Sequence, residues 1–501
     1  MKPPVTSHAV ALVLISLLAA GCSDSSENNR VAPEFKERPC AFPDGTPGLE
    51  RITCGMVTVA VRPGDAAGRT VDIGLAIVGA ANPEAKKDAP ILFIQGGPAS
   101  PAVMMAPQWV GSVMAEDRDI IIFDRRGSHF SGPRLCPDTS FALVSDVESD
   151  LTAEESLDWY VEKARTCRQE MTQAGHAPQD YTITRITEDI ESIRRALGVS
   201  QWNVIGHSAG GPQALDLMRS YPKSTRAVIL ESAAHLRGDD YGAVYQRLFE
   251  RSLRKIFDGC AAEPACAAQH PDPEKTLMEA LASFEEAPLE LTLPGADGAP
   301  GQSVFLNHQD LVVLLFSQTY NAADVPNIPN MIAAAAQRNV QVFAPLAGMF
   351  SFLEAMSAED VRLSIECDHF LTREIIPAPA PANALQEAIS RASPAGLQYS
   401  EVCPVFLPDV AESALDPELP SVDVPVLVMT GEYDGIIPPA VGKAMADGLK
   451  RAYHVNFDYA SHQLFVPHAC THALAKSFFD APSVAPEASS CQAAITSPFR
   501  Q

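Results

Sequence analysis

A serine enclosed by two glycines is the residue with the clearest chemical meaning in this sequence. The pentapeptide GHSAG at 206–210 carries Ser208 at its centre. It follows an apolar, strand-like run at 202–205 and precedes a helical pattern at 212–220. A Gly-x-Ser-x-Gly at such a turn exposes the serine hydroxyl, and the helix N-terminus behind it favours developing negative charge. The sequence therefore predicts that Ser208 is a nucleophile, with a chance Gly/Ser turn as the alternative.

A serine hydroxyl needs a base, and that base needs a carboxylate to orient it. Asp434 lies in the loop after the apolar run 424–429, and His462 follows the strand-like segment 452–458. The order serine, acid, histidine is the one found when these groups are carried by an α/β sheet. We expect His462 to take the proton of Ser208 and Asp434 to fix the tautomer of His462.

Two backbone amides are predicted to complete the site. Acyl transfer requires donors for the oxyanion, and one should be the N–H of Ala209, directly after the nucleophile. The other should come from the loop that follows the apolar run 90–95, which reads Gln-Gly-Gly-Pro. Pro98 has no N–H, so Gly97, or else Gly96, is the second expected donor.

Several other polar residues could compete for these roles. Glu432 is the alternative acid, but it lies nearer the preceding strand. His207 neighbours the nucleophile and is expected to point away from the reacting atoms. His235 and His369 are kept as possible substrate contacts. The Asp-Arg-Arg-Gly segment at 124–127 is interpreted as a structural brace for the loops around the site.

The pattern of apolar runs predicts the fold that positions these residues. Continuous runs rich in Ile, Val and Leu are typical of strands buried on both faces of a parallel sheet, and they occupy residues 90–95, 119–123, 202–205, 227–230 and 424–429. Residues 54–62 and 70–80 are expected to open the sheet as an antiparallel pair, and 186–197 to form a helix that ends at Gly198. We therefore expect an α/β-hydrolase fold, with a mostly parallel central sheet between helices.

The alternation of strand-like and helical segments stops after Ser232, which predicts an insertion. The segment up to Pro420 is rich in Ala and Glu with helical spacing, which indicates a mostly helical cap inserted between two strands of the catalytic core. The expected division of the chain is a signal peptide (1–21), a flexible tether (22–38), the first part of the core (39–232), the helical cap (233–420) and the second part of the core (421–501).

Together these motifs resemble those of the prolyl and tripeptidyl aminopeptidase group of α/β-hydrolases, the TAP-like serine peptidases. The resembling segments are QGGP at 95–98, DRRG at 124–127, GHSAGG at 206–211, GEYDGIIPP at 431–439 and SH at 461–462. The likeness extends from about Cys40 to Cys491. It departs from the usual pattern in QGGPAS, where relatives often have HGGPGG, in the residue after the nucleophile, and at Ser461, where glycine is usual.

The resemblance implies an aminopeptidase that acts on short peptides with a free N-terminus and needs no cofactor. Such a site requires an anion for the α-ammonium, and Glu231, Glu366 and Asp368 are the candidates. A solvated loop carboxylate is the alternative for Glu231. An esterase with the same triad is the competing function, because fold and triad do not set the substrate. A third hypothesis is a non-catalytic binding protein, but the complete predicted triad argues against it.

The N-terminus and the cysteines indicate export. An apolar stretch of signal-peptide length ends in LAAGC, which resembles a bacterial lipobox and predicts lipidation of Cys22; a plain secretory signal is the alternative. Ser23 carries no inner-membrane retention signal, so the periplasmic side of the outer membrane or the cell surface is expected. The ten other cysteines are disulfide candidates in sequence-local pairs whose connectivity the sequence leaves open: Cys40 with Cys54, Cys136 with Cys167, Cys260 with Cys266, Cys367 with Cys403, and Cys470 with Cys491. Their spacing does not fit zinc, so no metal is expected.

Charge limits the partners. The net charge of −25 argues against nucleic acid, because phosphate binding needs clustered Lys and Arg. We expect a small peptide or ester as the substrate and a membrane contact only through the lipid anchor. The sequence makes no prediction of oligomeric state.

Overall fold

The computed structural model describes residues 33–43, 45–65, 68–136, 150–236, 241–293, 302–343, 358–371, 380–392, 399–408 and 415–500. Cys22 and the expected signal peptide lie outside these residues. No helix in the described part of the chain is long and apolar enough to cross a membrane.

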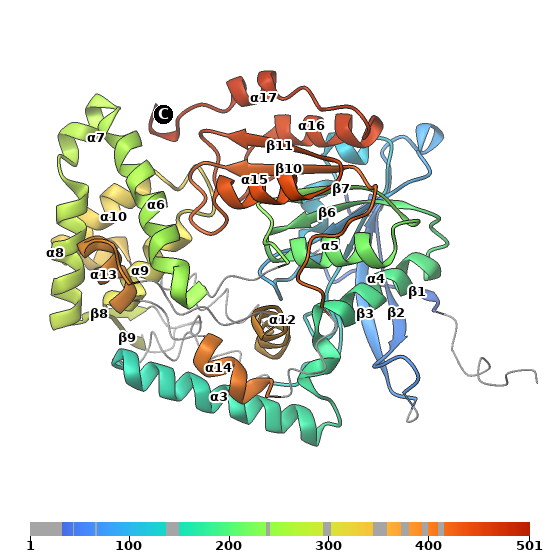
Figure 1. The fold of residues 1–501 in the computed structure, drawn as a ribbon, viewed down its shortest axis with the longest axis horizontal. Helices are drawn as coiled ribbons and strands as arrows, with labels where there is room; N and C mark the ends of the chain where they lie inside the picture. Colours follow the sequence, from blue (N-terminus) through green and yellow to red (C-terminus); the bar gives the residue numbers. More distant parts are fainter. Residues whose placement is uncertain are drawn as a thin grey trace, which may run out of the picture. The chain divides into compact units, whose positions relative to one another are not determined.

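A nine-stranded sheet forms the centre of the fold, in the order β1-β2-β3-β5-β4-β6-β7-β10-β11 (Figure 1). Its strands are β1 (Phe35–Arg38), β2 (Ile52–Ala60), β3 (Thr70–Val78), β4 (Ile91–Ile94), β5 (Ile120–Phe123), β6 (Trp202–His207), β7 (Thr225–Glu231), β10 (Val426–Gly431) and β11 (Ala452–Phe457). The strands from β5 to β11 are parallel, and β1, β2 and β3 are antiparallel to their neighbours. The expected antiparallel opening and parallel series are therefore confirmed.

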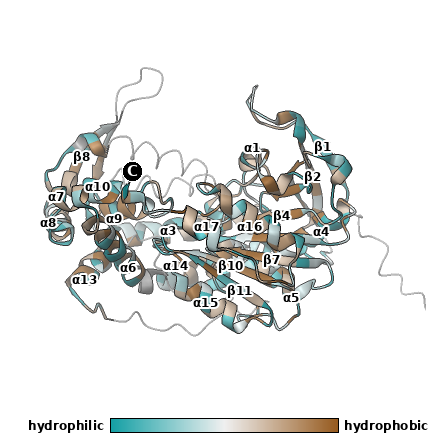
Figure 2. Ribbon diagram, turned by 90° about the horizontal axis from the view of Figure 1, so that it is seen from above, coloured by the Kyte–Doolittle hydropathy of each residue, from teal (hydrophilic) through white to brown (hydrophobic). Residues whose placement is uncertain are grey.

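Continuous apolar strands are needed because both faces of the sheet are buried. Along β6, Val204 packs into a core with Ile190 of α4 (Ile183–Ala196). The next residue, Ile205, faces the opposite core with Phe478 of α16 (Ala469–Asp480). The strands β4, β7 and β10 are brown on the hydropathy scale of Figure 2, as burial on both sides requires. The remaining helices of these layers are α1 (Ala106–Trp109), α3 (Ala153–Gln173), α5 (Gly211–Ser220), α15 (Pro439–Gly448) and α17 (Ser489–Ala494).

The segment between β7 and β10 packs largely around a hydrophobic core that includes Phe249, Leu281 and Ile332, whereas Val361 and Val402 of this segment join the core beside the sheet. Its helices are α6 (Tyr241–Ala261), α7 (Pro264–Gln269), α8 (Pro273–Glu286), α9 (His308–Ser317), α10 (Asn327–Ala336), α12 (Glu359–Leu371), α13 (Ala384–Arg391) and α14 (Tyr399–Phe406). The sequence did not predict its antiparallel pair, β8 (Leu289–Leu293) and β9 (Gln302–Leu306). The pair is short, and only alternate residues such as Leu289 and Leu291 are buried.

Five disulfides connect elements that are near in sequence. They join Cys40 to Cys54, Cys136 to Cys167, Cys260 to Cys266, Cys367 to Cys403, and Cys470 to Cys491, with Cα–Cα distances from 5.1 to 5.4 Å. The sequence-local pairing is therefore the one in the structure. The fourth bond ties α12 to α14, and α14 in turn packs on α3 (Figure 1). Disulfides persist in oxidising compartments, so these bonds indicate an exported protein.

Candidate active site

Ser208 occupies a strained turn between β6 and α5. Its φ of 52° is in the left-handed region, which a residue with a Cβ rarely adopts. The turn is tight on both sides of the serine. A Cβ on Gly206 would lie 2.7 Å from Ala214 Cβ, and a Cβ on Gly210 only 2.3 Å from the carbonyl oxygen of Ile94. The two glycines are thus required by close backbone approach, and the strain is the kind stored at functional turns.

Asp434 and His462 meet in the interior of the protein. His462 Nδ1 lies 2.8 Å from Asp434 Oδ2, and the two residues are 1% and 0% exposed. Asp434 Oδ1 accepts hydrogen bonds from the N–H groups of Ile436 and Ile437, at 2.8 and 2.9 Å. One oxygen therefore fixes the carboxylate to its own loop while the other orients the imidazole.

The alternative acid, Glu432, is engaged elsewhere. One of its oxygens forms ion pairs with Arg251 at 2.7 Å and Lys255 at 3.2 Å, both on α6. Its other oxygen accepts a hydrogen bond from the Asn456 side chain. Glu432 therefore tethers α6 to the loop after β10 and has no hydrogen bond to His462.

The second nitrogen of His462 is buried and has no hydrogen-bond partner among the described residues. The imidazole packs against two rings, His207 and Tyr320, each with its centroid 5.2 Å away. Next to it, the N–H of Gln463 donates to the carbonyl oxygen of Tyr320 at 2.8 Å. No hydrogen bond joins Nε2 to Ser208 Oγ in this structure, as is common in unliganded sites where catalytic bonds tighten only with substrate.

The loop after β4 brings amide donors against the serine. A Cβ on Gly96 would lie 2.6 Å from Ser208 Cβ, so the loop is in direct contact with the elbow. The Gly96 N–H already donates to Gln95 Oε1 at 2.9 Å. In the described part of the chain, nothing accepts a hydrogen bond from the N–H of Gly97 or Ala209. Of the two glycines that the sequence left open, Gly97 is thus the one with a free amide.

The segment 124–127 holds this loop in place, as the sequence suggested. Asp124 accepts hydrogen bonds from the N–H groups of Ala102 and Val103, at 2.7 and 3.0 Å. Arg125 donates to the carbonyl oxygen of Gln95. Burial lowers the pKa of Arg125 to about 10, against the opposing charge of Asp124, so the guanidinium stays protonated at neutral pH.

Glu231 is not the solvated loop carboxylate that one reading expected. It ends β7, is 3% exposed and is the register partner of His207 on β6. Its Oε2 lies 3.1 Å from His207 Nδ1, and its Oε1 accepts the N–H groups of Leu464 and Phe465 at 2.8 and 3.0 Å. Both oxygens are therefore occupied by the protein, and Glu231 fixes the part of the loop that directly follows His462.

Burial and the charge of the partner shift the pKa values of both Glu231 and His207. Burial alone would raise the pKa of the Glu231 carboxyl, but the charge of His207 and the two amides outweigh it and leave the pKa below its usual value. Burial alone would lower the pKa of His207, but the negative charge of Glu231 outweighs it and raises the pKa. The two side chains thus favour the ionised pair.

The other two acid candidates lie on α12 and differ in their surroundings. Asp368 is 1% exposed and accepts the N–H of Ile183 at 3.3 Å, which is a structural role. Glu366 is half-buried. Tyr320 is 39% exposed, yet loss of hydration, with the negative charges of Asp434 and Glu366, raises the pKa of its phenol to about 12. Glu366 is therefore electrostatically coupled to the ring that packs on His462.

The two histidines kept as possible substrate contacts are linked to each other in the structure. His369 Nε2 lies 2.6 Å from the carbonyl oxygen of His235. The preceding residue, Ala234, donates its N–H to the carbonyl oxygen of Ser208 at 2.9 Å. α12 is thereby connected to the elbow through the segment after β7, a connection across distant parts of the chain that no sequence signal could reveal.

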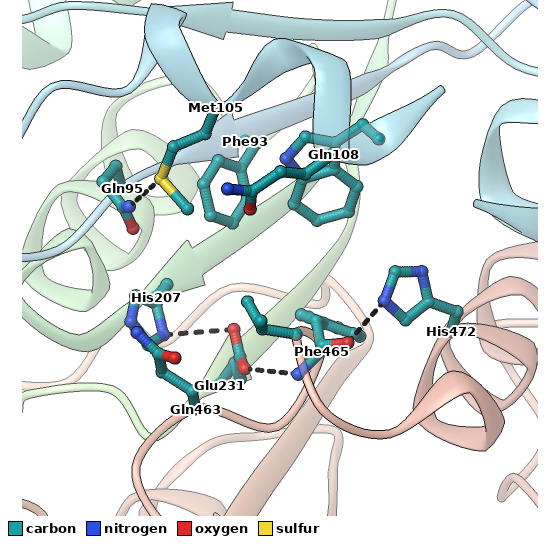
Figure 3. Close-up of a pocket in the computed structure, with 11 residues that line it drawn as sticks. Phe93, Gln95, Met105, Gln108, His207, Glu231, Gln463, Phe465 and His472 are labelled. Atoms are coloured by element: carbon teal, nitrogen blue, oxygen red, sulfur yellow. Dashed lines mark hydrogen bonds and ion pairs between the residues drawn. The ribbon is translucent and has the colours of Figure 1, made fainter. Parts of the chain in front are cut away.

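A cavity of about 250 Å³ opens beside the elbow (Figure 3). His207 and Glu231 line one side of it, and Gln95 comes from the loop after β4. Trp109 and Phe465 contribute aromatic rings. Sequence reasoning missed this cavity, because its lining comes from segments that are up to several hundred residues apart. Among the described residues, no group of three or more His, Cys, Asp or Glu is placed to hold a metal ion.

Comparison with known proteins gives two family matches. Residues 89–258 match the α/β hydrolase fold family, and residues 397–491 match the family described as TAP-like protein. The two matches contain Ser208 and the pair Asp434 and His462, respectively.

Curated relatives are distant. The chain is 24% identical over 196 residues to tripeptidyl aminopeptidase of Streptomyces coelicolor, a match that covers 37% of this chain and 35% of that protein. It is 23% identical over 271 residues to the protein YuaR of Escherichia coli, covering 52% of each. The chain thus spans about a third to about half of the length of these relatives.

A hydrolytic enzyme from Pseudomonas aeruginosa PAO1 is among the similar solved structures, with 14% identity, a TM-score of 0.37, and coverage of 90% of this chain and 98% of that chain. The sheet order, the two family matches and the distant aminopeptidase relatives all indicate an α/β-hydrolase. The chain is a hydrolase of the α/β fold, and its residues 397–491 resemble the family described as TAP-like protein.

Proposed function

We propose that this protein is a serine aminopeptidase that releases residues or short peptides from free peptide N-termini through an acyl-enzyme on Ser208. The observation that carries the serine chemistry is the buried His462–Asp434 pair, beside a serine with a φ of 52°. The remaining nitrogen of His462 has no hydrogen-bond partner among the described residues. The family matches and the tripeptidyl aminopeptidase relatives support the peptide substrate.

The proposed reaction gives each of these groups a defined step. His462 Nε2 takes the hydroxyl proton while Ser208 Oγ attacks the carbonyl carbon of the scissile bond. The N–H groups of Gly97 and Ala209 donate to the resulting oxyanion. The C–N bond then breaks, His462 gives its proton to the leaving amine, and water hydrolyses the acyl-enzyme by the same proton path. Asp434 stabilises the imidazolium that forms in both halves.

For the substrate's α-ammonium we propose Glu366 as the partner. Burial raises the pKa of Glu366, while the charge of Arg362 and a hydrogen bond with Tyr399 favour its ionised form. Its charge acts on Tyr320, which packs against His462. Glu231, in contrast, has both oxygens held by His207 and two backbone amides. Burying an ammonium without an anion is costly. A site that supplies the anion should therefore discriminate strongly against a substrate that lacks the charge.

The test is kcat/KM for a tripeptide amide with a free amino group and for its N-acetylated form. We expect preference for the free peptide, up to about 10⁴-fold for a well-built polar site. Glu366→Gln should raise KM for the free peptide and hardly affect a small neutral ester, while Glu401→Gln on the exposed side of α14 serves as the matched control. Equal values for the two peptides, or a clear preference for esters, would favour the esterase alternative.

We also propose that the protein is held at the bacterial envelope by lipid on Cys22. The lipobox-like LAAGC at 18–22 and the five disulfides support this location. Two or more acyl chains anchor a protein stably.

A further inference from the structure

We propose that the cavity beside His207 is the binding site for the first residue of the leaving peptide, and that it selects a large apolar side chain there. This inference deepens the proposed function and rests on it. It assigns a substrate class to the far side of the scissile bond, which neither the triad nor the ammonium site determines.

The position of the cavity supports this role. Its lining includes Gln95, two residues before the expected oxyanion donor Gly97, and Gln463, directly after His462. The leaving group must lie near His462, because His462 Nε2 gives it a proton. A cavity between the oxyanion loop and the histidine loop is therefore where the leaving peptide continues.

Two different rings, Tyr320 and His207, pack on His462, and we assign one end of the substrate to each. Tyr320 packs on the imidazole, and the charge of Glu366 on α12 acts on Tyr320, so the proposed ammonium end lies on that side. His207 also packs on the imidazole, and His207 lines the cavity. The cavity thus belongs to the end of the substrate that does not carry the ammonium.

The lining of the cavity fits an apolar side chain. Figure 3 shows Phe93 and Met105 facing His207 and Phe465 across the space. Trp109 adds an aromatic ring that packs at a tilt against Phe93, with the ring centroids 4.8 Å apart. Aromatic and thioether groups bind apolar side chains, and methionine adapts to their shape.

The polar groups of the cavity are already satisfied or neutral. The charge of Glu231 is compensated by His207 and by two backbone amides. The side chains of Gln108 and Gln463 are uncharged amides suited to the backbone of a bound peptide. A charged side chain would find no opposite charge that is not already paired.

The size of the cavity points to a single side chain. Its volume is about 250 Å³, below the range of roughly 300–1,000 Å³ that holds drug-sized ligands. Val466, which is 58% exposed, lines the cavity, so a larger side chain at this position should reduce the cavity volume.

The first experiment measures binding of the leaving-group residue itself. Calorimetric titration of the Ser208→Ala protein with phenylalaninamide and with glycinamide should show binding at least about tenfold tighter for phenylalaninamide. Val466→Trp should abolish this preference. Val484→Trp, at an equally small valine that is 63% exposed and outside the cavity, should leave it unchanged.

The second experiment uses acyl transfer in the active protein. A peptide methyl ester acylates Ser208: Oγ attacks the ester carbon, the C–O bond to the methoxy group breaks, and methanol leaves with the hydroxyl proton. An added amine then attacks the acyl carbon. The bond to Oγ breaks, and His462 moves the amine proton to Oγ. At equal amine concentration, phenylalaninamide should capture at least about ten times more acyl group than glycinamide. Val466→Trp should reduce this ratio towards one.

The two proposals fail in different ways. Equal binding and equal capture of the two amines, or equal loss in both tryptophan variants, would overturn the assignment of the cavity even if free peptides are preferred over acetylated ones. Equal cleavage of free and acetylated peptides, with the amine preference intact, would overturn the aminopeptidase and leave the cavity as a leaving-group site. If no ester acylates the protein, the titration alone decides on the cavity.

Discussion

A single hydrogen bond decides which carboxylate can serve as the acid of the site. Asp434 is 2.8 Å from His462 Nδ1, whereas Glu432 is held by Arg251 and Lys255. Asp434→Asn should therefore lower kcat by about 10⁴, because the amide favours the wrong tautomer of the imidazole.

Glu432→Gln is the matched comparison, since it makes the same chemical change two residues away. It should weaken the attachment of α6 and reduce thermal stability, with a small effect on kcat. Steady-state kinetics and thermal unfolding of both variants check this. A larger loss of kcat in Glu432→Gln than in Asp434→Asn would show that the wrong acid has been chosen.

The buried His207–Glu231 pair predicts a pH dependence of stability. The pKa of Glu231 is lowered, so its contribution is present above its ordinary value of 4.5 and is lost as the pH falls through the lowered pKa. The pKa of His207 is raised, so its contribution is present below its ordinary value of 6.5 and is lost as the pH rises through the raised pKa. The pair should therefore stabilise the folded protein most between about pH 4.5 and pH 6.5.

Melting temperatures of the wild type and of a His207→Gln/Glu231→Gln double variant, measured from pH 4 to pH 9, test this expectation. The difference should be greatest at about pH 4.5–6.5 and should shrink on the alkaline side. A difference that is constant over the whole range would mean that the pair contributes no ionic stabilisation.

Residue types and order could predict the proposed triad but not the contacts that hold it in place. Ser208, Asp434 and His462 each stand in a loop after an apolar strand, so their chemistry can be inferred from local sequence. The contacts of Glu231 with Leu464 and Phe465 join residues more than two hundred positions apart. Such a contact depends on which strands are neighbours, and a single sequence does not contain that information.

At the scale of elements, the loop after β4 is the most constrained part of the site. Gly97 has a φ of 92°, and a Cβ there would lie 1.8 Å from Ser100 Oγ. Gly97→Ala should displace the amide that is expected to donate to the oxyanion. We expect kcat to fall by about 10²–10³, the usual effect of losing one such donor.

Gly64→Ala controls for the backbone conformation. Gly64 also has a positive φ, of 71°, but a Cβ there would have nothing within 4 Å. This variant should keep kcat and lose only stability, which comparison of kcat with the melting temperature will show. Similar losses of kcat in the two variants would mean that Gly97 acts through general stability and not through the oxyanion.

Among the elements, the sequence predicts the buried strands better than the exposed ones. Runs such as residues 120–123 are apolar throughout because both faces of the sheet are covered. The strand β1, Phe-Lys-Glu-Arg, has three charged residues and exists because β2 supplies its hydrogen bonds. The order of the strands, in which β5 lies between β3 and β4, is likewise set by tertiary packing.

At the scale of the whole molecule, the disulfides and the N-terminal segment support the proposed location of the protein at the bacterial envelope. Cys22→Ser should release the protein from the membrane fraction and leave its activity unchanged, because the ten other described cysteines are already paired. Fractionation and metabolic labelling with a radioactive fatty acid check this. Wild-type protein that takes up no label and is found only in the soluble periplasm would contradict the lipid anchor.

Labelling of Ser208 tests the central claim most directly. Wild type and Ser208→Ala are each incubated with a serine-directed phosphonate, the adducts are located by peptide mass spectrometry, and turnover is measured in parallel. We predict a single adduct on Ser208 in the wild type, loss of turnover in step with labelling, and neither adduct nor turnover in a folded Ser208→Ala protein. An adduct on another serine, or near-wild-type turnover by Ser208→Ala, would contradict the assignment of Ser208 as the nucleophile.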